Sequence, residues 1–227
     1  MFLIASYPRS GNHLVRSCVE YVTGRPTLGC PGNPKDIPIH LNGFADAPEI
    51  LSHVNGDAVA HKVHFVPELE NLLRLHQISK FIFIKRNATE AILAHIASQN
   101  RRLSFKRLNR QIYKYTELES YYAGSELPKI CINYQNLISQ DADIYSAELD
   151  KLFQFLGPLV IPHYSDDLKA NFGVFRLTIA NPSKRAWAGK RSHGANYWRK
   201  NTTWSKRLLI KLLIWYNKFR FLLPGTK

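Results

Sequence analysis

An apolar segment, a short turn of small and basic residues and an amphipathic segment follow one another at the start of the chain. The apolar segment, residues 2–6, predicts a buried strand, and residues 14–22 predict a helix. A strand that passes through a short turn into a helix directs free backbone N–H groups and the positive helix end toward one point. This order therefore predicts an α/β unit with a phosphate-binding turn.

The turn itself carries further groups that suit a phosphate. Arg9 supplies a fixed positive charge, and the side chains of Ser10 and Asn12 can donate hydrogen bonds. The Walker pattern of nucleotide triphosphatases is missing, so an ordinary ATP or GTP loop is not expected. A tight turn that binds no ligand is the alternative for this segment taken alone.

Residues 7–14 (YPRSGNHL) resemble the 5′-phosphosulfate loop of the sulfotransferases that use 3′-phosphoadenosine 5′-phosphosulfate (PAPS). The resemblance implies a three-layer, P-loop-like α/β fold with a central parallel sheet flanked by helices. It also implies that five residues of the turn bind the cofactor: Arg9, Ser10, Gly11, Asn12 and His13. Leu14 stands where the family often has tryptophan, so we expect adenine to stack on Tyr134 instead.

A second segment, residues 60–65 (AHKVHF), resembles the lysine–x–histidine element of the same family. The resemblance makes His64 the catalytic base, and imidazole has an ordinary pKa suited to that task near neutral pH. Side chains alternate along a strand, so Lys62 and His64 point to the same side. A surface histidine at a strand end is the alternative for this pair in isolation.

A third segment, residues 80–92 (KFIFIKRNATEAI), resembles the family strand that ends in an arginine for the 3′-phosphate of the cofactor. Arg86 takes that position, and its planar guanidinium suits a phosphate. Ala94 stands where the family has a serine. Ser98, one helical turn later, is the candidate replacement.

Three more segments complete the series. Residues 130–137 (ICINYQNL) resemble a family strand whose tyrosine meets the nucleotide, and residues 152–157 (LFQFLG) resemble the end of a family helix. The spacing of apolar residues predicts that helix over residues 142–156, with Gly157 as its C-cap. Residues 191–200 (RSHGANYWRK) resemble the loop that closes over the 3′-phosphate. The resemblance places Arg191, Ser192 and His193 of this loop at the cofactor. Ser192 and His193 differ from the residues that the family has at these positions.

The order of these segments predicts one domain over residues 1–204 and a separate helix over residues 205–227. Four strands alternate with helical stretches, which predicts a parallel sheet covered on both faces. These strands are residues 2–6, 58–63, 80–85 and 129–134. Residues 24–38 predict a long loop near the site, and residues 101–122 predict a helix on the acceptor side.

The cysteines and the start of the chain indicate a cellular compartment. Three cysteines without metal-ligand spacing predict reduced thiols and no metal site. Met1 leads directly into the first strand, which leaves no room for a signal peptide. We therefore expect a cytoplasmic protein, with a peripheral position at the inner membrane face as an option.

The net charge of +14 exceeds what a cofactor pocket needs. An acidic acceptor or an anionic membrane would use the excess, whereas nucleic acid is not expected because its binding motifs are missing. Residues 204–223 combine a basic stripe with apolar and aromatic side chains, and the charges exclude a spanning helix. The segment packs on the domain or a partner subunit, or it lies in a membrane interface.

The sequence as a whole predicts a sulfotransferase that moves a sulfuryl group from PAPS to a hydroxyl or amine. By resemblance, His64 takes the acceptor proton while Lys62 and Arg9 stabilise developing charge. The acceptor is left open among a glycan, a lipid and a small molecule, and a homodimer is compatible with the sequence. A nucleotide kinase using ATP and magnesium and a non-catalytic membrane-associated module remain the alternatives.

Overall fold

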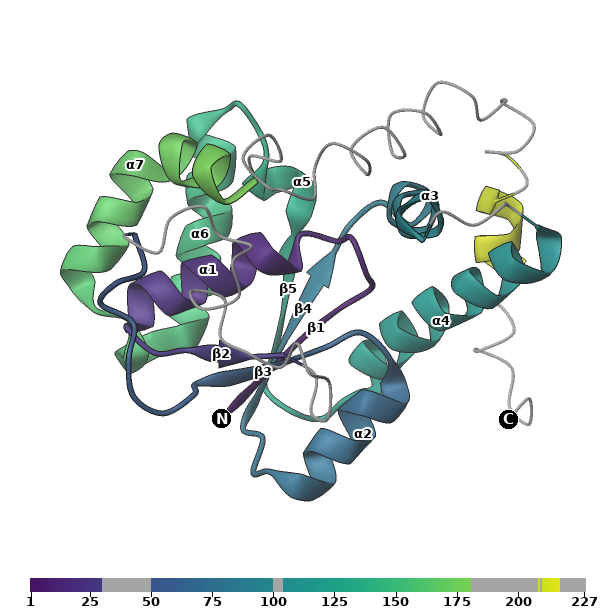
Figure 1. Ribbon diagram of the computed structural model, residues 1–227, viewed down its shortest axis with the longest axis horizontal. Helices are drawn as coiled ribbons and strands as arrows, with labels where there is room; N and C mark the ends of the chain where they lie inside the picture. The colour runs from purple at the N-terminus through teal and green to yellow at the C-terminus, as the bar shows by residue number, and fades with distance from the viewer. Residues whose placement is uncertain (30–49, 100–103, 181–207, 209, 217–227) are drawn as a thin grey trace.

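The computed structural model describes residues 1–29, 50–99, 104–180, 208 and 210–216. Its centre is a five-stranded, all-parallel sheet with the strand order β2-β3-β1-β4-β5 (Figure 1). The strands are β1 (Phe2–Ser6), β2 (Thr27–Leu28), β3 (Ala60–Val63), β4 (Lys80–Lys85) and β5 (Lys129–Asn133). This confirms the predicted α/β fold with a central parallel sheet.

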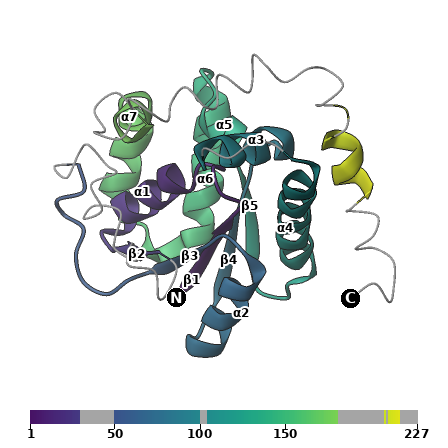
Figure 2. The ribbon, with the colours of Figure 1, turned by 45° about the vertical axis from the view of Figure 1, so that its right-hand side comes forward.

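Helices connect the strands and cover the sheet on both sides (Figures 1 and 2). They are α1 (Asn12–Thr23), α2 (Val66–Leu75), α3 (Ala88–Ser98), α4 (Phe105–Gly124), α5 (Tyr134–Leu137), α6 (Ala142–Leu156), the 3-10 helix η2 (Gly157–Leu159) and α7 (Pro162–Ala180). Residues 208 and 210–216 are also helical.

The alternation of side chains along β1 explains the three layers. Phe2 and Ile4 are buried in a cluster with apolar residues of α1, α6 and α7. Leu3 and Ala5 point the other way and are buried with residues of α2 and with Leu118 of α4. Because both faces of this central strand are covered by apolar side chains, it has no solvent-exposed face.

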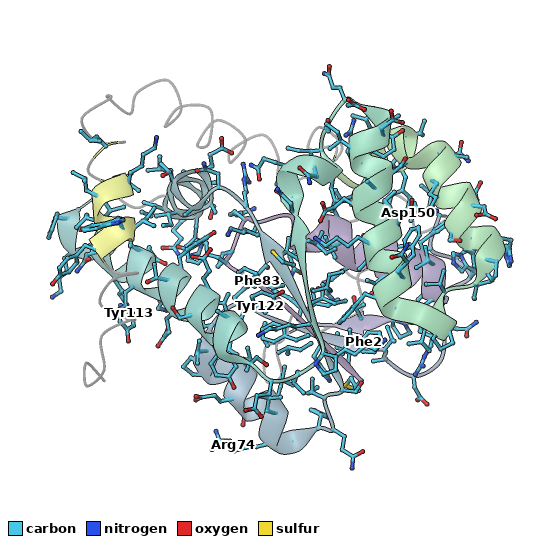
Figure 3. All side chains as sticks on the ribbon, turned by 180° about the vertical axis from the view of Figure 1, so that it is seen from behind. Phe2, Arg74, Phe83, Tyr113, Tyr122 and Asp150 are labelled. Carbon is cyan, nitrogen blue, oxygen red and sulfur yellow. The ribbon has the colours of Figure 1, made fainter. Side chains whose placement is uncertain are left out.

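Aromatic stacking fixes the position of α4 against the sheet. The ring of Tyr122 on α4 stacks on that of Phe83 on β4, with centroids 4.8 Å apart (Figure 3). A third apolar cluster joins the other half of α4 to α3, to Tyr7 and to Ile210. The segment after β1 and the helical residues 210–216 therefore share one core.

The predicted strands are confirmed with small differences at their ends. β1 and β4 have the predicted bounds, β3 begins at Ala60 rather than at residue 58, and Tyr134 begins α5 rather than ending β5. The helix predicted over residues 142–156 is confirmed and is followed by Gly157 with φ 64°. The predicted loop of residues 24–38 is corrected, because β2 lies within it and pairs with β3.

The described part of the predicted C-terminal helix packs on the domain. Ile210 is fully buried in the cluster with α3 and α4. The boundary at residue 204 lies outside the described residues and stays a prediction. Among the described helices, none combines the length and the apolar character that crossing a membrane requires.

Candidate functional site

The strand order brings four predicted site segments to one edge of the sheet. In spatial order, His64 follows β3, residues 7–11 follow β1, Arg86 follows β4 and Tyr134 follows β5. These four strands are consecutive neighbours and run parallel, so the residues after them meet at the same carboxyl edge. Ligands of open α/β sheets bind at this edge, where the chain connections change direction.

The loop after β1 has an unusual backbone. Arg9 has φ 69° and is the single non-glycine residue with a positive φ in the described ranges. Gly11 precedes α1 with φ 89°, and the N–H of Ser10 donates to the carbonyl of Tyr7 at 3.2 Å. A left-handed arginine costs on the order of 1–3 kcal/mol, and such strain concentrates at functional sites.

Three polar atoms around this loop are buried without a hydrogen-bond partner within the described structure. They are Ser10 Oγ, Asn12 Oδ1 and Arg86 Nε. The amide nitrogen of Asn12 is engaged, because it donates to Ser6 Oγ at 3.0 Å. Ser10 Oγ and Arg86 Nε are donors that suit phosphate oxygens, so these two residues fit an anionic ligand at the start of α1.

His64 is held in one tautomer at the end of β1. Its Nδ1 lies 2.6 Å from the carbonyl oxygen of Ser6, which can only accept, so Nδ1 carries the proton and donates it. The backbone N–H of His64 donates to Glu68 Oε2 at 2.8 Å. Nε2 is therefore the nitrogen with a free lone pair in the neutral ring, as a general base requires.

The surroundings of His64 keep its ring neutral. Burial lowers the pKa of His64 well below its ordinary value, and the positive charge of Lys62 lowers it further. The bond to the Ser6 carbonyl opposes this shift, while His13 and His95 add to it. At neutral pH the imidazole is therefore neutral, and Nε2 is able to take a proton.

Arg86 connects the end of β4 to the loop after β1. Its Nη1 donates to the carbonyl of Arg9 at 2.7 Å, and its Nη2 pairs with Glu90 at 3.2 Å. The carbonyl of Arg86 accepts from the hydroxyl of Tyr115 at 2.8 Å. The guanidinium is thus oriented by the loop itself, and its unpartnered Nε remains for a ligand.

Tyr134 lies directly against the loop. A Cβ atom added to Gly11 would be 2.0 Å from Cδ2 of Tyr134, so only glycine allows this approach. The guanidinium carbon of Arg86 lies 5.1 Å from the centroid of the tyrosine ring. Arg86 therefore covers one face of the ring, and any adenine stacking on Tyr134 would have to use the other face.

The structure does not bring Ser98 to this edge. Ser98 ends α3, about 15 Å along the helix axis from its first residue, and its hydroxyl donates to the carbonyl of His95 at 2.8 Å. The role predicted for it therefore gains no geometric support. Arg191, Ser192 and His193 lie outside the described residues, and their cofactor role stays a prediction.

Two contributors to the site were not anticipated from the sequence. His95 lies edge-on to Tyr7, and burial together with the charges of Arg9 and Lys114 lowers its pKa to about 4. Glu68 lies in the first turn of α2 and accepts from the backbone of His64. A proline and a glutamate at the start of a helix signal such a cap, whereas no sequence pattern marks His95.

Comparison with known proteins adds no family to this geometry. No protein-family model matches the chain, and no curated protein matches it either. The geometry of the site and the resemblance of its motifs are therefore the basis for assigning a function.

Gly11→Ala is expected to lower the free energy of unfolding by about 2–5 kcal/mol. The left-handed backbone contributes about 1–2 kcal/mol and the contact with Tyr134 about 1–3 kcal/mol. Gly56→Ala is the matched control, because Gly56 has φ 74° and open space where its Cβ would be. Urea unfolding of both variants isolates the contact, and equal losses would show that Tyr134 does not constrain position 11.

The lowered pKa values of His64 and His95 predict that the protein loses stability between pH 7 and pH 5. The unfolded chain takes up protons near pH 6.5 while the folded rings stay neutral, which costs about 2 kcal/mol at pH 5 for His95, whose folded pKa is about 4. The lowered pKa of His64 adds a loss in the same direction. Urea unfolding across this range measures the slope. His64→Asn should flatten it, and a slope that this substitution leaves unchanged would show that His64 does not contribute.

Proposed function

We propose that this protein is a sulfotransferase that moves a sulfuryl group from PAPS to a hydroxyl or amine of an acceptor. One observation carries the proposal: the imidazole of His64 donates to the carbonyl of Ser6, the last residue of β1, directly beside a loop whose buried donors suit an anion. A base beside a site for a phosphosulfate is the arrangement that sulfuryl transfer to a hydroxyl needs. The motif resemblance along the chain supports the same function.

The residues of the loop and of the neighbouring strand ends would hold the donor. Ser10 and the backbone at the start of α1, where Asn12 and His13 lie, suit the 5′-phosphosulfate. Arg86 suits the 3′-phosphate through its unpartnered Nε. When bound, PAPS supplies the activated sulfuryl group.

The protein contributes a base and positive charge. His64 takes the acceptor proton at Nε2, since Nδ1 is occupied by the Ser6 carbonyl. Arg9 and Lys62 supply positive charge near the transferred group, and Arg9 acts by charge alone because arginine does not release a proton. The strained backbone at Arg9 supports a role for that residue in function.

The two alternatives differ from this proposal in ligand and chemistry. A nucleotide kinase would bind ATP with magnesium, and a non-catalytic module would bind neither donor. A base held in its neutral form favours transfer to a hydroxyl or amine over a purely structural role for this edge of the sheet. A cytoplasmic location belongs to the same proposal.

Incubation with PAPS carrying labelled sulfate, over panels of glycans, lipids and small phenols, tests the activity. We expect label to move to at least one class of acceptor with the wild-type protein and not with His64→Asn. Transfer of phosphate from labelled ATP to any of the same acceptors would replace this proposal with the kinase alternative.

A further inference from the structure

The helical residues 208 and 210–216 have two apolar faces. Ile210 is buried against α3 and α4, and Leu213 and Ile214 pack beside it. Successive residues turn by about 100° around a helix, so the opposite side carries a second set of side chains. This outer face consists of Leu208, Lys211, Leu212, Trp215 and Tyr216, and its apolar members are 40–67% exposed.

The start of α4 lies beside this segment (Figures 1 and 2) and presents a similar mixture. Phe105 is 63% exposed, Tyr113 is exposed (Figure 3), and Lys106 and Arg110 are exposed between them. The first turn of α4 contains no acidic residue. Aromatic and basic side chains therefore cover two adjacent elements.

The basic residues at the start of α4 are unfavourable for the helix itself. The N-terminal end of a helix carries partial positive charge and favours anions, yet Lys106 lies in the first turn together with Arg107. Ser104 caps this helix end by accepting from the backbone N–H of Arg107. A lipid phosphate would bind the exposed cations beside it and offset the positive charge gathered there.

We propose that the outer face and the exposed start of α4 dock on an anionic membrane surface. Trp215 and Tyr216 suit the headgroup level, Leu208 and Leu212 suit the boundary of the acyl chains, and the lysines and arginines suit anionic headgroups. The net charge of +14 complements such a surface. A second copy of the chain is a poorer occupant, because a symmetric contact would bring the same cations together.

Co-sedimentation of the full chain with vesicles of phosphatidylcholine and phosphatidylglycerol tests the docking. We expect binding that weakens as salt rises, and much weaker binding to phosphatidylcholine alone. Lys106→Gln with Arg110→Gln should weaken binding by about 25-fold, since each basic residue near an anionic surface contributes about fivefold. Leu212→Ser with Trp215→Ser should weaken it at every salt concentration, because burial of apolar side chains is not screened.

A matched pair on α7 controls for the loss of exposed apolar surface. Val174 and Leu177 are 68% and 65% exposed, and Val174→Ser with Leu177→Ser should leave vesicle binding unchanged. Thermal melting of each variant shows whether it is folded. Absence of vesicle binding by the wild-type protein would overturn the proposal. So would a dimer in sedimentation velocity that Leu212→Ser with Trp215→Ser dissociates, because that result assigns the face to a second copy.

Discussion

His64→Asn is expected to lower the rate of sulfuryl transfer by ~10²–10⁴-fold, the usual contribution of a general base. Asparagine keeps an N–H near the position of Nδ1 and can still donate to the Ser6 carbonyl, but it has no atom equivalent to Nε2. The substitution therefore removes the base and retains the local bond. Initial rates with labelled PAPS measure the effect, and binding of adenosine 3′,5′-bisphosphate should stay within about twofold of the wild-type value.

His64→Ala separates the catalytic role from a positioning role. Alanine removes both the base and the bond to Ser6, so it should be as inactive as asparagine if Nε2 takes the proton. Recovery of activity in the asparagine variant alone would assign His64 to holding the end of β1. His163→Asn on α7 is the matched control for loss of a histidine and should keep the wild-type rate.

Arg86→Ala is expected to weaken binding of adenosine 3′,5′-bisphosphate by about 10- to 100-fold and to affect adenosine 5′-monophosphate much less. Hydrogen bonds to charged groups contribute about 1.5–3 kcal/mol each, and only the bisphosphate has a 3′-phosphate for this guanidinium. Titration calorimetry of both nucleotides measures the difference. Arg191→Ala should show the same selectivity if that residue also binds the 3′-phosphate.

Arg86 also donates to the carbonyl of Arg9, so its loss could disturb the loop. A disturbed loop would weaken both nucleotides equally, and that result would show that Arg86 does not recognise the 3′-phosphate. Arg176→Ala is the control. Like Arg86, Arg176 lies over a tyrosine ring, that of Tyr145, and donates to a backbone carbonyl, that of Leu137. It should leave both affinities unchanged.

The sequence predicted the elements whose signals are local. β1 and β4 are continuous apolar runs with clear ends, and the helix over residues 142–156 stops at a glycine with positive φ. β2 was missed because it has two residues and depends on its pairing with β3, far along the chain. A strand of this length has no periodicity of its own to recognise.

The candidate site was predictable as a set of strand ends but not as a set of contacts. His64, Arg86 and Tyr134 each follow an apolar run in the sequence. That Tyr134 touches Gly11, and that Arg86 holds the carbonyl of Arg9, depend on which strands are neighbours. His95 joins the site through the packing of α3, which residue spacing does not specify.

A thermal-shift comparison of adenosine 3′,5′-bisphosphate, ATP with magnesium, and buffer tests the central claim most directly. A ligand at about 100 times its dissociation constant stabilises the native state by about 2.7 kcal/mol, which raises the Tm of a domain of this size by about 5–10 °C. We expect that rise with the bisphosphate and a smaller one with ATP. A rise with ATP and magnesium alone, or with neither nucleotide, would contradict a PAPS-dependent sulfotransferase.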